Sequence, residues 1–91
     1  FLCLLTSTAL GEKKSFKLGV ILPLTGALSI QGIPMKNAFE LAKQQLDLEN
    51  QIDLLFEDDE FIPKNSVSAA RKLINQDSID ALAIFGTNQG L

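Results

Sequence analysis

The fold is decided by the stretch Lys17-Leu18-Gly19-Val20-Ile21-Leu22-Pro23-Leu24-Thr25-Gly26. It begins as a run of mainly apolar residues about as long as a β-strand, and it ends at a turn made of Pro, Thr and Gly. A near-continuous apolar run is typical of a strand that is covered on both faces of a parallel sheet. Pro23 ends the run because proline has no amide hydrogen for the ladder of a sheet. The stretch therefore predicts a buried strand over residues 17–22, followed by a loop.

Two helical patterns and two further apolar runs follow this strand in a regular order. The first helical pattern begins at Pro34, since proline suits the first turn of a helix, and it leads to an apolar run over 52–56. The second begins at Pro63 and leads to a third run over 81–85. Strand starts that lie roughly thirty residues apart suit right-handed βαβ crossovers. The order predicts an α/β fold with a parallel sheet.

Each helical pattern has apolar residues at steps of three and four, which places them on one face of a helix. The residues of the first pattern that we expect to face the sheet are Met35, Ala38, Phe39, Ala42 and Leu46. Those of the second pattern are Val67, Ala70, Leu73 and Ile74. Between the first strand and the first helix, we expect Gly26, Gly32 and Pro34 to organise a loop.

Composition excludes several classes of function for this segment. The chain has 8 Lys and Arg against 11 Asp and Glu, with no basic cluster, which argues against nucleic acid as a partner. It has no His and a single cysteine, Cys3, so transition-metal sites, Cys-His or Ser-His catalysis and an internal disulfide are all excluded here. We expect no metal and no cofactor.

Residues 1–11 look like the end of a secretion signal. An apolar run from Phe1 to Leu5 precedes small residues that are typical of a cleavage site, with cutting expected before Glu12 or before Leu10. The run is too short for a transmembrane helix, although a buried N-terminal strand or helix is the alternative. We expect 12–15 to form a linker.

The chain is also expected to be the N-terminal piece of a larger protein. The pattern predicts three strands, whereas a doubly wound sheet usually has about five or more. The same expectation makes 16–91 an incomplete domain.

Three loops are candidate sites, because parallel α/β sheets bind ligands beyond the carboxyl ends of their strands. The first contains Thr25, Gly26, Ser29, Gln31 and Gly32. It has neither the Gly-Lys-Ser/Thr of a P-loop nor the G-x-G-x-x-G of a dinucleotide fold, so ligand binding and an ordinary loop both stay open.

The other two loops differ in their chemistry. In Glu57-Asp58-Asp59-Glu60, consecutive residues point to opposite faces, so turn and helix-capping roles for Asp58 or Asp59 are favoured over a metal site. The third loop, Gly86-Thr87-Asn88-Gln89-Gly90-Leu91, offers neutral donors and acceptors and no catalytic group. That suits recognition of a polar solute, with a plain turn as the alternative.

The order and spacing of these motifs resemble the start of a solute-binding protein. The matching features are V-I-L-P-L-T-G over 20–26, Gly32, the apolar helix face with Ala38 and Ala42, then Asp58-Asp59, Pro63, Ala70, Leu73 and Ile74. The chain is similar over 16–91 to the Leu/Ile/Val-binding type of ABC transporter receptor, which has the type I periplasmic-binding fold. The resemblance implies two α/β lobes with a hinge and a cleft between them. Residues 16–91 would form a parallel βαβαβ half of the N-terminal lobe.

The resemblance also implies ligand contacts. These would come from Gln31, Thr87, Asn88, Gln89 and Gly90. In the branched-chain members an aromatic contact falls at Gln31, and a serine hydroxyl that meets the ligand carboxylate falls at Gly90. Gln31 replaces an apolar wall with a polar group, and Gly90 keeps only the backbone amide. The expected ligand is therefore a small polar solute, such as an amino acid, an amide or a related carboxylate.

One further departure concerns the second helix: Ile62 stands where an Asp usually precedes the Pro, so a helix cap is lost or moved.

The function implied by the resemblance is capture of a solute for ABC-type import, with a membrane permease as partner and no catalysis. The protein would be a monomer in the periplasm or on the outer face of the cytoplasmic membrane. An alternative is an envelope regulator similar to the penicillin-binding protein activators, whose first strand reads close to V-L-L-P-L-S-G. A third is an enzyme of flavodoxin-like or Rossmann class, which would need a cofactor motif further along the chain.

Overall fold

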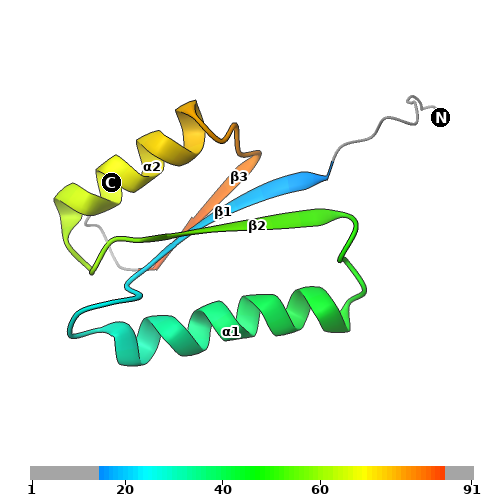
Figure 1. Cartoon of the computed structure of the whole chain (residues 1–91), viewed down its shortest axis with the longest axis horizontal. Coiled ribbons are helices and arrows are strands. Elements are labelled where there is room, and N and C mark those ends of the chain that lie inside the picture. Colours follow the sequence, from blue (N-terminus) through cyan, green and yellow to red (C-terminus); the bar gives the residue numbers. More distant parts are fainter. Residues whose placement is uncertain (1–14, 86–91) are drawn as a thin grey trace.

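The computed structural model describes residues 15–85. These form a three-stranded parallel sheet with two helices, in the order β1 (Phe16–Leu22), α1 (Ser29–Gln45), β2 (Ile52–Asp58), α2 (Pro63–Asn75) and β3 (Ala81–Ile84) (Figure 1). The predicted α/β fold and the predicted order of elements are confirmed.

The central strand is β1, because the order across the sheet is β2-β1-β3. Its register with β2 runs from Phe16 opposite Ile52 to Leu22 opposite Asp58. Its register with β3 runs from Leu18 opposite Ala81 to Ile21 opposite Ile84. All pairs are parallel, so the three strands end on one side of the sheet, which we call the carboxyl edge.

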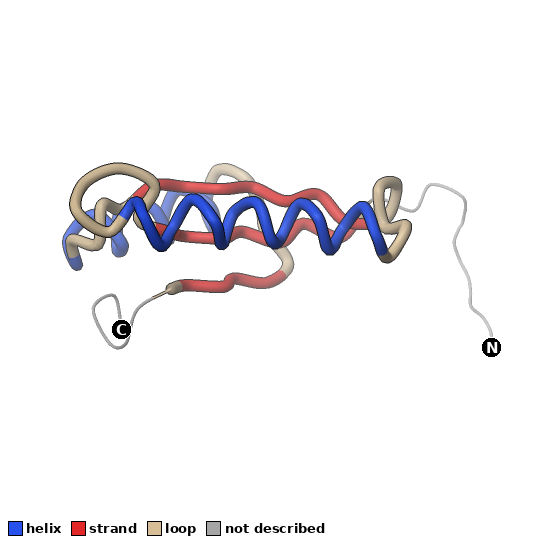
Figure 2. Tube along the Cα trace, turned by 90° about the horizontal axis from the view of Figure 1, so that it is seen from below, coloured by secondary structure: helices blue, strands red, loops and turns tan. Residues whose placement is uncertain are grey.

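The two helices cover opposite faces of the sheet (Figures 1 and 2). This follows from handedness: the crossover from β1 to β2 moves one way across the sheet, and the crossover from β2 to β3 moves back the other way. Right-handed connections then place their helices on opposite sides. Neither of these helices has the length and apolar character needed to cross a membrane.

The core lies between α2 and the sheet. Its buried centre is Ile21, Ala69 and Leu73, and the partly buried residues packed around it are Leu55, Ala70, Ile79, Leu82 and Ile84. Val20 and Leu22, which alternate with Ile21, are buried on the α1 side. The strand predicted to be covered on both faces is thus confirmed as the most buried element.

The predicted inner face of α2 is partly wrong. Leu73 is buried, but Val67 and Ile74 are 38% and 55% exposed. The buried side of the helix instead includes Ser66 and Ala69. Serine and alanine carry little hydrophobic signal, so the pattern of large apolar residues indicated a face that is rotated from the real one.

The start of α1 is also different from the prediction. The helix begins at Ser29, so Pro34 lies inside it and Gly32 is helical rather than part of a loop. The sequence from Ser29 to Ile33 contains a glycine and two β-branched residues, which weaken a helical pattern. Tertiary packing at Gly32, described below, accounts for the earlier start.

Only part of the predicted α1 face meets the sheet. Met35 and Phe39 are partly buried, and the Phe39 ring lies edge-on to Phe56 of β2 with centroids 6.2 Å apart. Ala38, Ala42 and Leu46 are exposed. The helix has apolar residues on its outer side as well, namely Ile30, Ile33 and Leu41, so its sequence does not single out one face.

Candidate functional site

The loop between β1 and α1 lies at the carboxyl edge and turns at Leu24-Thr25-Gly26. Gly26 has φ +87°, a left-handed conformation that favours glycine. The turn passes into α1 through a hydrogen bond from the Ser29 amide to the Gly26 carbonyl, at 3.2 Å. Thr25 and Gly26 are exposed, so burial does little to hold this part of the loop.

Asp58, the last residue of β2, holds the turn by hydrogen bonds. Its Oδ1 accepts from the amides of Leu24, Thr25 and Glu60, at 2.8, 3.3 and 2.9 Å. Its Oδ2 accepts from the Thr25 hydroxyl at 2.6 Å. We call these four residues the Asp58 network. It forms because the parallel register places Asp58 opposite Leu22, just before the loop begins.

The Asp58 network favours a charged carboxylate. Burial by itself raises the pKa of Asp58, but the Thr25 hydroxyl and the amides of Glu60, Leu24 and Thr25 outweigh it. The pKa therefore lies below its usual value, because these donors bind the ionised form more strongly than the protonated form. Asp58 is ionised and fully engaged as an acceptor at neutral pH.

Asp59 points away from Asp58 and attaches the end of β2 to α2. It is 1% exposed, and its Oδ1 accepts from the Phe61 amide at 2.9 Å while its Oδ2 accepts from the Ser66 hydroxyl at 2.5 Å. The predicted turn role of the acidic segment is confirmed. A role in capping the helix is wrong, because the bonded amides precede α2 and Ile62 makes no side-chain cap hydrogen bond. The departure at Ile62 had implied that this cap is lost or moved, and the structure shows no side-chain cap at Ile62.

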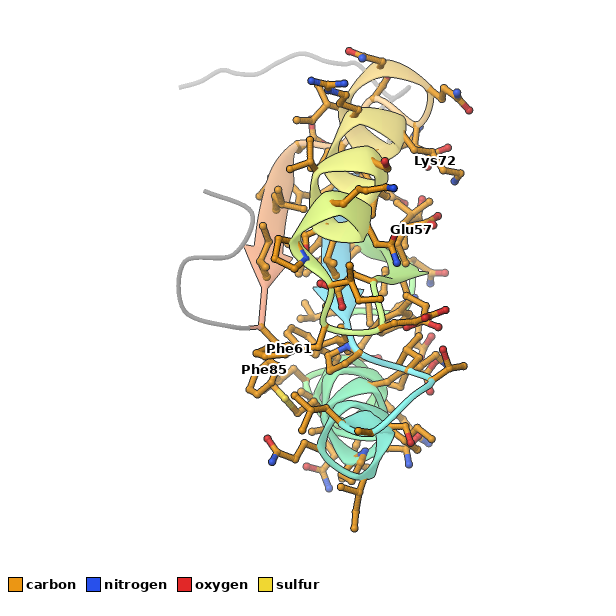
Figure 3. The ribbon with its side chains drawn as sticks, turned by 90° about the vertical axis from the view of Figure 1, so that its left-hand side faces the viewer. Glu57, Phe61, Lys72 and Phe85 are labelled. Carbon is orange, nitrogen blue, oxygen red and sulfur yellow. The ribbon has the colours of Figure 1, made fainter. Side chains whose placement is uncertain are left out.

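The described residues give no support to a metal site. Within the part of the chain from 15 to 85, no three Asp, Glu, Cys or His side chains lie close enough together to hold a metal ion. Glu57 is engaged elsewhere: its Oε2 lies 2.7 Å from Lys72 Nζ of α2 (Figure 3). Glu57 and then Asp77, which is 3.1 Å away, raise the pKa of Lys72 by hydrogen bonding to its charged form.

Gln31, one of the predicted ligand contacts, lies in the first turn of α1 and is exposed. Its backbone amide donates to the Leu28 carbonyl at 2.9 Å, which fixes the backbone. The helix start follows directly from the loop at the carboxyl edge (Figure 1). The placement is compatible with a ligand contact, which stays a prediction.

Gly32 has a structural role that the sequence did not reveal. A Cβ at this position would lie 1.9 Å from the carbonyl oxygen of Pro23 and 2.7 Å from its carbonyl carbon. Only glycine lets the first turn of α1 pack this closely against the end of β1. Glycine is therefore required at this helical position for packing against Pro23.

The other predicted contacts, Thr87, Asn88, Gln89 and Gly90, lie outside the described residues. The described chain ends at Phe85, directly after β3. The Phe85 amide donates to the Ile21 carbonyl of β1 at 3.1 Å. The end of β3 therefore lies beside the end of β1 at the carboxyl edge.

Two aromatic residues near this edge were not singled out by the sequence. The rings of Phe61 and Phe85 lie 6.0 Å apart (Figure 3). They line an apolar cavity of about 360 Å³ on the α1 side of the sheet, together with Val20, Leu22, Met35, Phe39, Ala83 and Ile84. Their places in the sequence could have marked them as candidates, because each follows closely on the end of a strand.

A larger cavity, of about 780 Å³, lies at the opposite, amino edge. Its lining residues include Lys17, Gln51 and Asp80. The larger volume of this cavity does not make it the ligand site, because ligands of parallel α/β sheets bind beyond the carboxyl ends of the strands. We therefore assign the candidate site to the carboxyl edge.

Comparison with solved structures shows the same arrangement in solute-binding proteins. A solute-binding protein of an ABC transporter from Rhodopseudomonas palustris BisB5, solved with 3,4-dihydroxybenzoic acid, superposes with a TM-score of 0.76 at 30% identity, over 85% of this chain and 22% of that one. The leucine-binding protein LivK from Thermotoga maritima gives 0.66 at 25%, over 74% and 20%. A putative branched-chain amino acid ABC transporter protein from Silicibacter pomeroyi gives 0.70 at 25%, over 77% and 19%.

The chain spans about a fifth of the length of these proteins, which have the type I periplasmic-binding fold. A search of curated proteins finds no match. The family model described as periplasmic binding protein matches residues 15–89, most of the sequence. Together with the fold, this match shows that the chain belongs to the periplasmic binding protein family.

Proposed function

We propose that the chain is part of an extracytoplasmic receptor that binds a small polar solute for ABC-type import. In this proposal residues 16–91 form the first part of the N-terminal lobe, and the ligand lies in a cleft between this lobe and a second one. The receptor would deliver its solute to a membrane permease. Export through the signal in residues 1–11 would place it in the periplasm or on the outer face of the cytoplasmic membrane.

The observation that carries the proposal is the hydrogen bond from the Phe85 amide to the Ile21 carbonyl. It joins the ends of β1 and β3, so the loops that follow these two strands start side by side at the carboxyl edge. One of these loops leads to the exposed Gln31, and the other begins the segment that contains Thr87 to Gly90. The shared starting point of these two loops supports the proposal that both predicted groups of ligand contacts serve one site.

The proposed solute is an amino acid, an amide or a related small carboxylate. One similar protein is named as a leucine-binding protein, and another was solved in complex with 3,4-dihydroxybenzoic acid. Both of these compounds carry a carboxylate. The proposed contacts from Thr87, Asn88 and the Gly90 amide are neutral donors, and each net hydrogen bond contributes about 1 kcal/mol. Closure of two lobes would add selectivity by removing water from around the ligand.

Titration calorimetry on the full-length protein tests this function. The panel consists of the standard amino acids, their amides and 3,4-dihydroxybenzoate. We expect at least one compound to bind, and we expect Gln31→Ala to weaken that binding by about fivefold to tenfold, as for one lost hydrogen bond. Gly90→Leu should abolish it by filling the cleft.

The matched control is Asn37→Ala, which also truncates an exposed polar side chain of α1 and should leave affinity unchanged. Equal affinity in all variants would remove Gln31 and Gly90 from the site. A wild-type protein that binds none of the panel would contradict the import function and favour the regulator alternative.

A further inference from the structure

We propose that Asp58 is a positioning residue for ligand binding: it sets the affinity of the site by fixing the β1–α1 turn, without touching the ligand. This inference rests on the proposed function, because it assumes that the carboxyl edge faces the ligand. Asp58 belongs to β2, a strand that supplies none of the predicted ligand contacts.

The first step is that the turn depends on Asp58. Among the described residues, the hydrogen bonds that join the Leu24–Leu28 loop to any element other than the adjoining α1 all end on this carboxylate. The remaining ones, such as the bond from Ser29 to Gly26, are local. Both ends of the loop are held by packing, since Pro23 is buried and meets Gly32, whereas Thr25, Gly26 and Ala27 in the middle are exposed.

The Asp58 carboxylate restrains both the backbone and a side chain of the turn. Three of the four donors in the Asp58 network come from the turn, and they include two consecutive amides and a hydroxyl. Consecutive amides on one acceptor fix the backbone of Leu24 and Thr25, while the Thr25 hydroxyl fixes its side chain. The charged acceptor makes these hydrogen bonds stronger than neutral ones. The turn is therefore ordered before any ligand arrives.

An ordered turn raises the affinity of the site for its ligand. The turn leads within one helical turn into Gln31, and it borders the edge where the loop after β3 begins. A turn that loses its acceptor becomes mobile and must be ordered when the ligand binds, and that ordering lowers affinity. We expect an effect of about tenfold on Kd, which corresponds to about 1.4 kcal/mol.

The experiment uses the full-length protein and the panel compound that the wild type binds most tightly by calorimetry. Asp58→Ala removes the acceptor, Thr25→Val removes one donor with little change of shape, and Thr25→Ser restores the hydroxyl. We expect about tenfold weaker binding for Asp58→Ala, a smaller loss for Thr25→Val and recovery in Thr25→Ser. The double variant Asp58→Ala/Thr25→Val should bind the ligand no more weakly than Asp58→Ala alone, because both changes act through one network.

The control is Ser66→Ala, which removes the hydrogen bond to the adjacent Asp59 on the α2 side and should lower stability with no change in Kd. Amide hydrogen exchange in the ligand-free protein gives a second readout: exchange across Leu24–Leu28 should rise at least tenfold in Asp58→Ala and stay unchanged in Ser66→Ala.

Three results would overturn the proposal and leave the proposed function intact. The first is an unchanged Kd in Asp58→Ala. The second is an equal loss of affinity in Ser66→Ala, which would mean that general destabilisation is the cause. The third is additive losses from Thr25→Val and Asp58→Ala, which would place the Thr25 hydroxyl on the ligand. A wild type that binds no panel compound contradicts the proposed function and this role together.

Discussion

Replacing Gly32 by alanine is expected to destabilise the protein by about 3 kcal/mol, although alanine is the better helix former. In an unconstrained helix the same change would stabilise by about 1 kcal/mol. Here the added Cβ would lie 1.9 Å from the Pro23 carbonyl oxygen, and the atoms in its way are backbone. Overpacking of this kind costs about 1–3 kcal/mol, and a clash with backbone belongs at the upper end. Urea unfolding of the full-length protein, followed by circular dichroism, measures the loss.

The control for this prediction is Gly26→Ala. A Cβ there would make only an ordinary van der Waals contact, with the nearest atom 3.9 Å away, so only the φ of +87° opposes the substitution. Its expected cost is about 1 kcal/mol. A Gly32→Ala protein as stable as the wild type, or more stable, would show that α1 does not pack on Pro23 in this way.

Replacing Leu73 by alanine should cost about 2–5 kcal/mol, since it leaves a cavity at the centre of the core. Leu73 is fully buried and packs in the cluster with Ile21 and Ala69. The matched control is Ile74→Ala, which removes an aliphatic side chain from the next residue of the same helix. Because Ile74 is 55% exposed, we expect it to cost less than about 1 kcal/mol.

Urea midpoints of the two variants decide where the buried face of α2 lies. The sequence pattern placed both residues on the inner face, whereas the structure buries one of them. Equal losses from Leu73→Ala and Ile74→Ala would support the face expected from the sequence and contradict the observed packing.

The strands could be predicted from the sequence because their signals are local. The apolar run that ends at Pro23 gave β1, and the run that ends at the acids after Phe56 gave β2. Pro63, expected to open the second helix, is the first residue of α2. Such signals depend on the chemistry of single residues, and neighbouring elements did not override them.

The features that could not be predicted depend on contacts between distant residues. The early start of α1 follows from Gly32 meeting Pro23, and the buried Ser66 follows from its bond to Asp59. The hydrogen bonds of Thr25 to Asp58 join residues 33 apart, and they require the register of β1 and β2 to be known.

The candidate site was predicted on different grounds from the fold. Its residues came from a resemblance rather than from spacing, and of them only Gln31 lies within residues 15–85. The structure places it at the carboxyl edge and exposed to solvent, which a ligand contact requires. The loop after β3 has a known starting point, at Phe85, but its contacts stay predictions.

The most direct test asks which edge of the sheet meets the solute. Hydrogen exchange by mass spectrometry on the full-length protein, with and without a bound panel compound, reports protection along the backbone. The account predicts that the ligand slows exchange in peptides that cover Leu24–Gln31 and Gly86–Gly90, and that exchange at Asn50–Gln51 and Ser78–Asp80 stays unchanged. Protection confined to Asn50–Gln51 and Ser78–Asp80, beside the larger cavity at the amino edge, would contradict it.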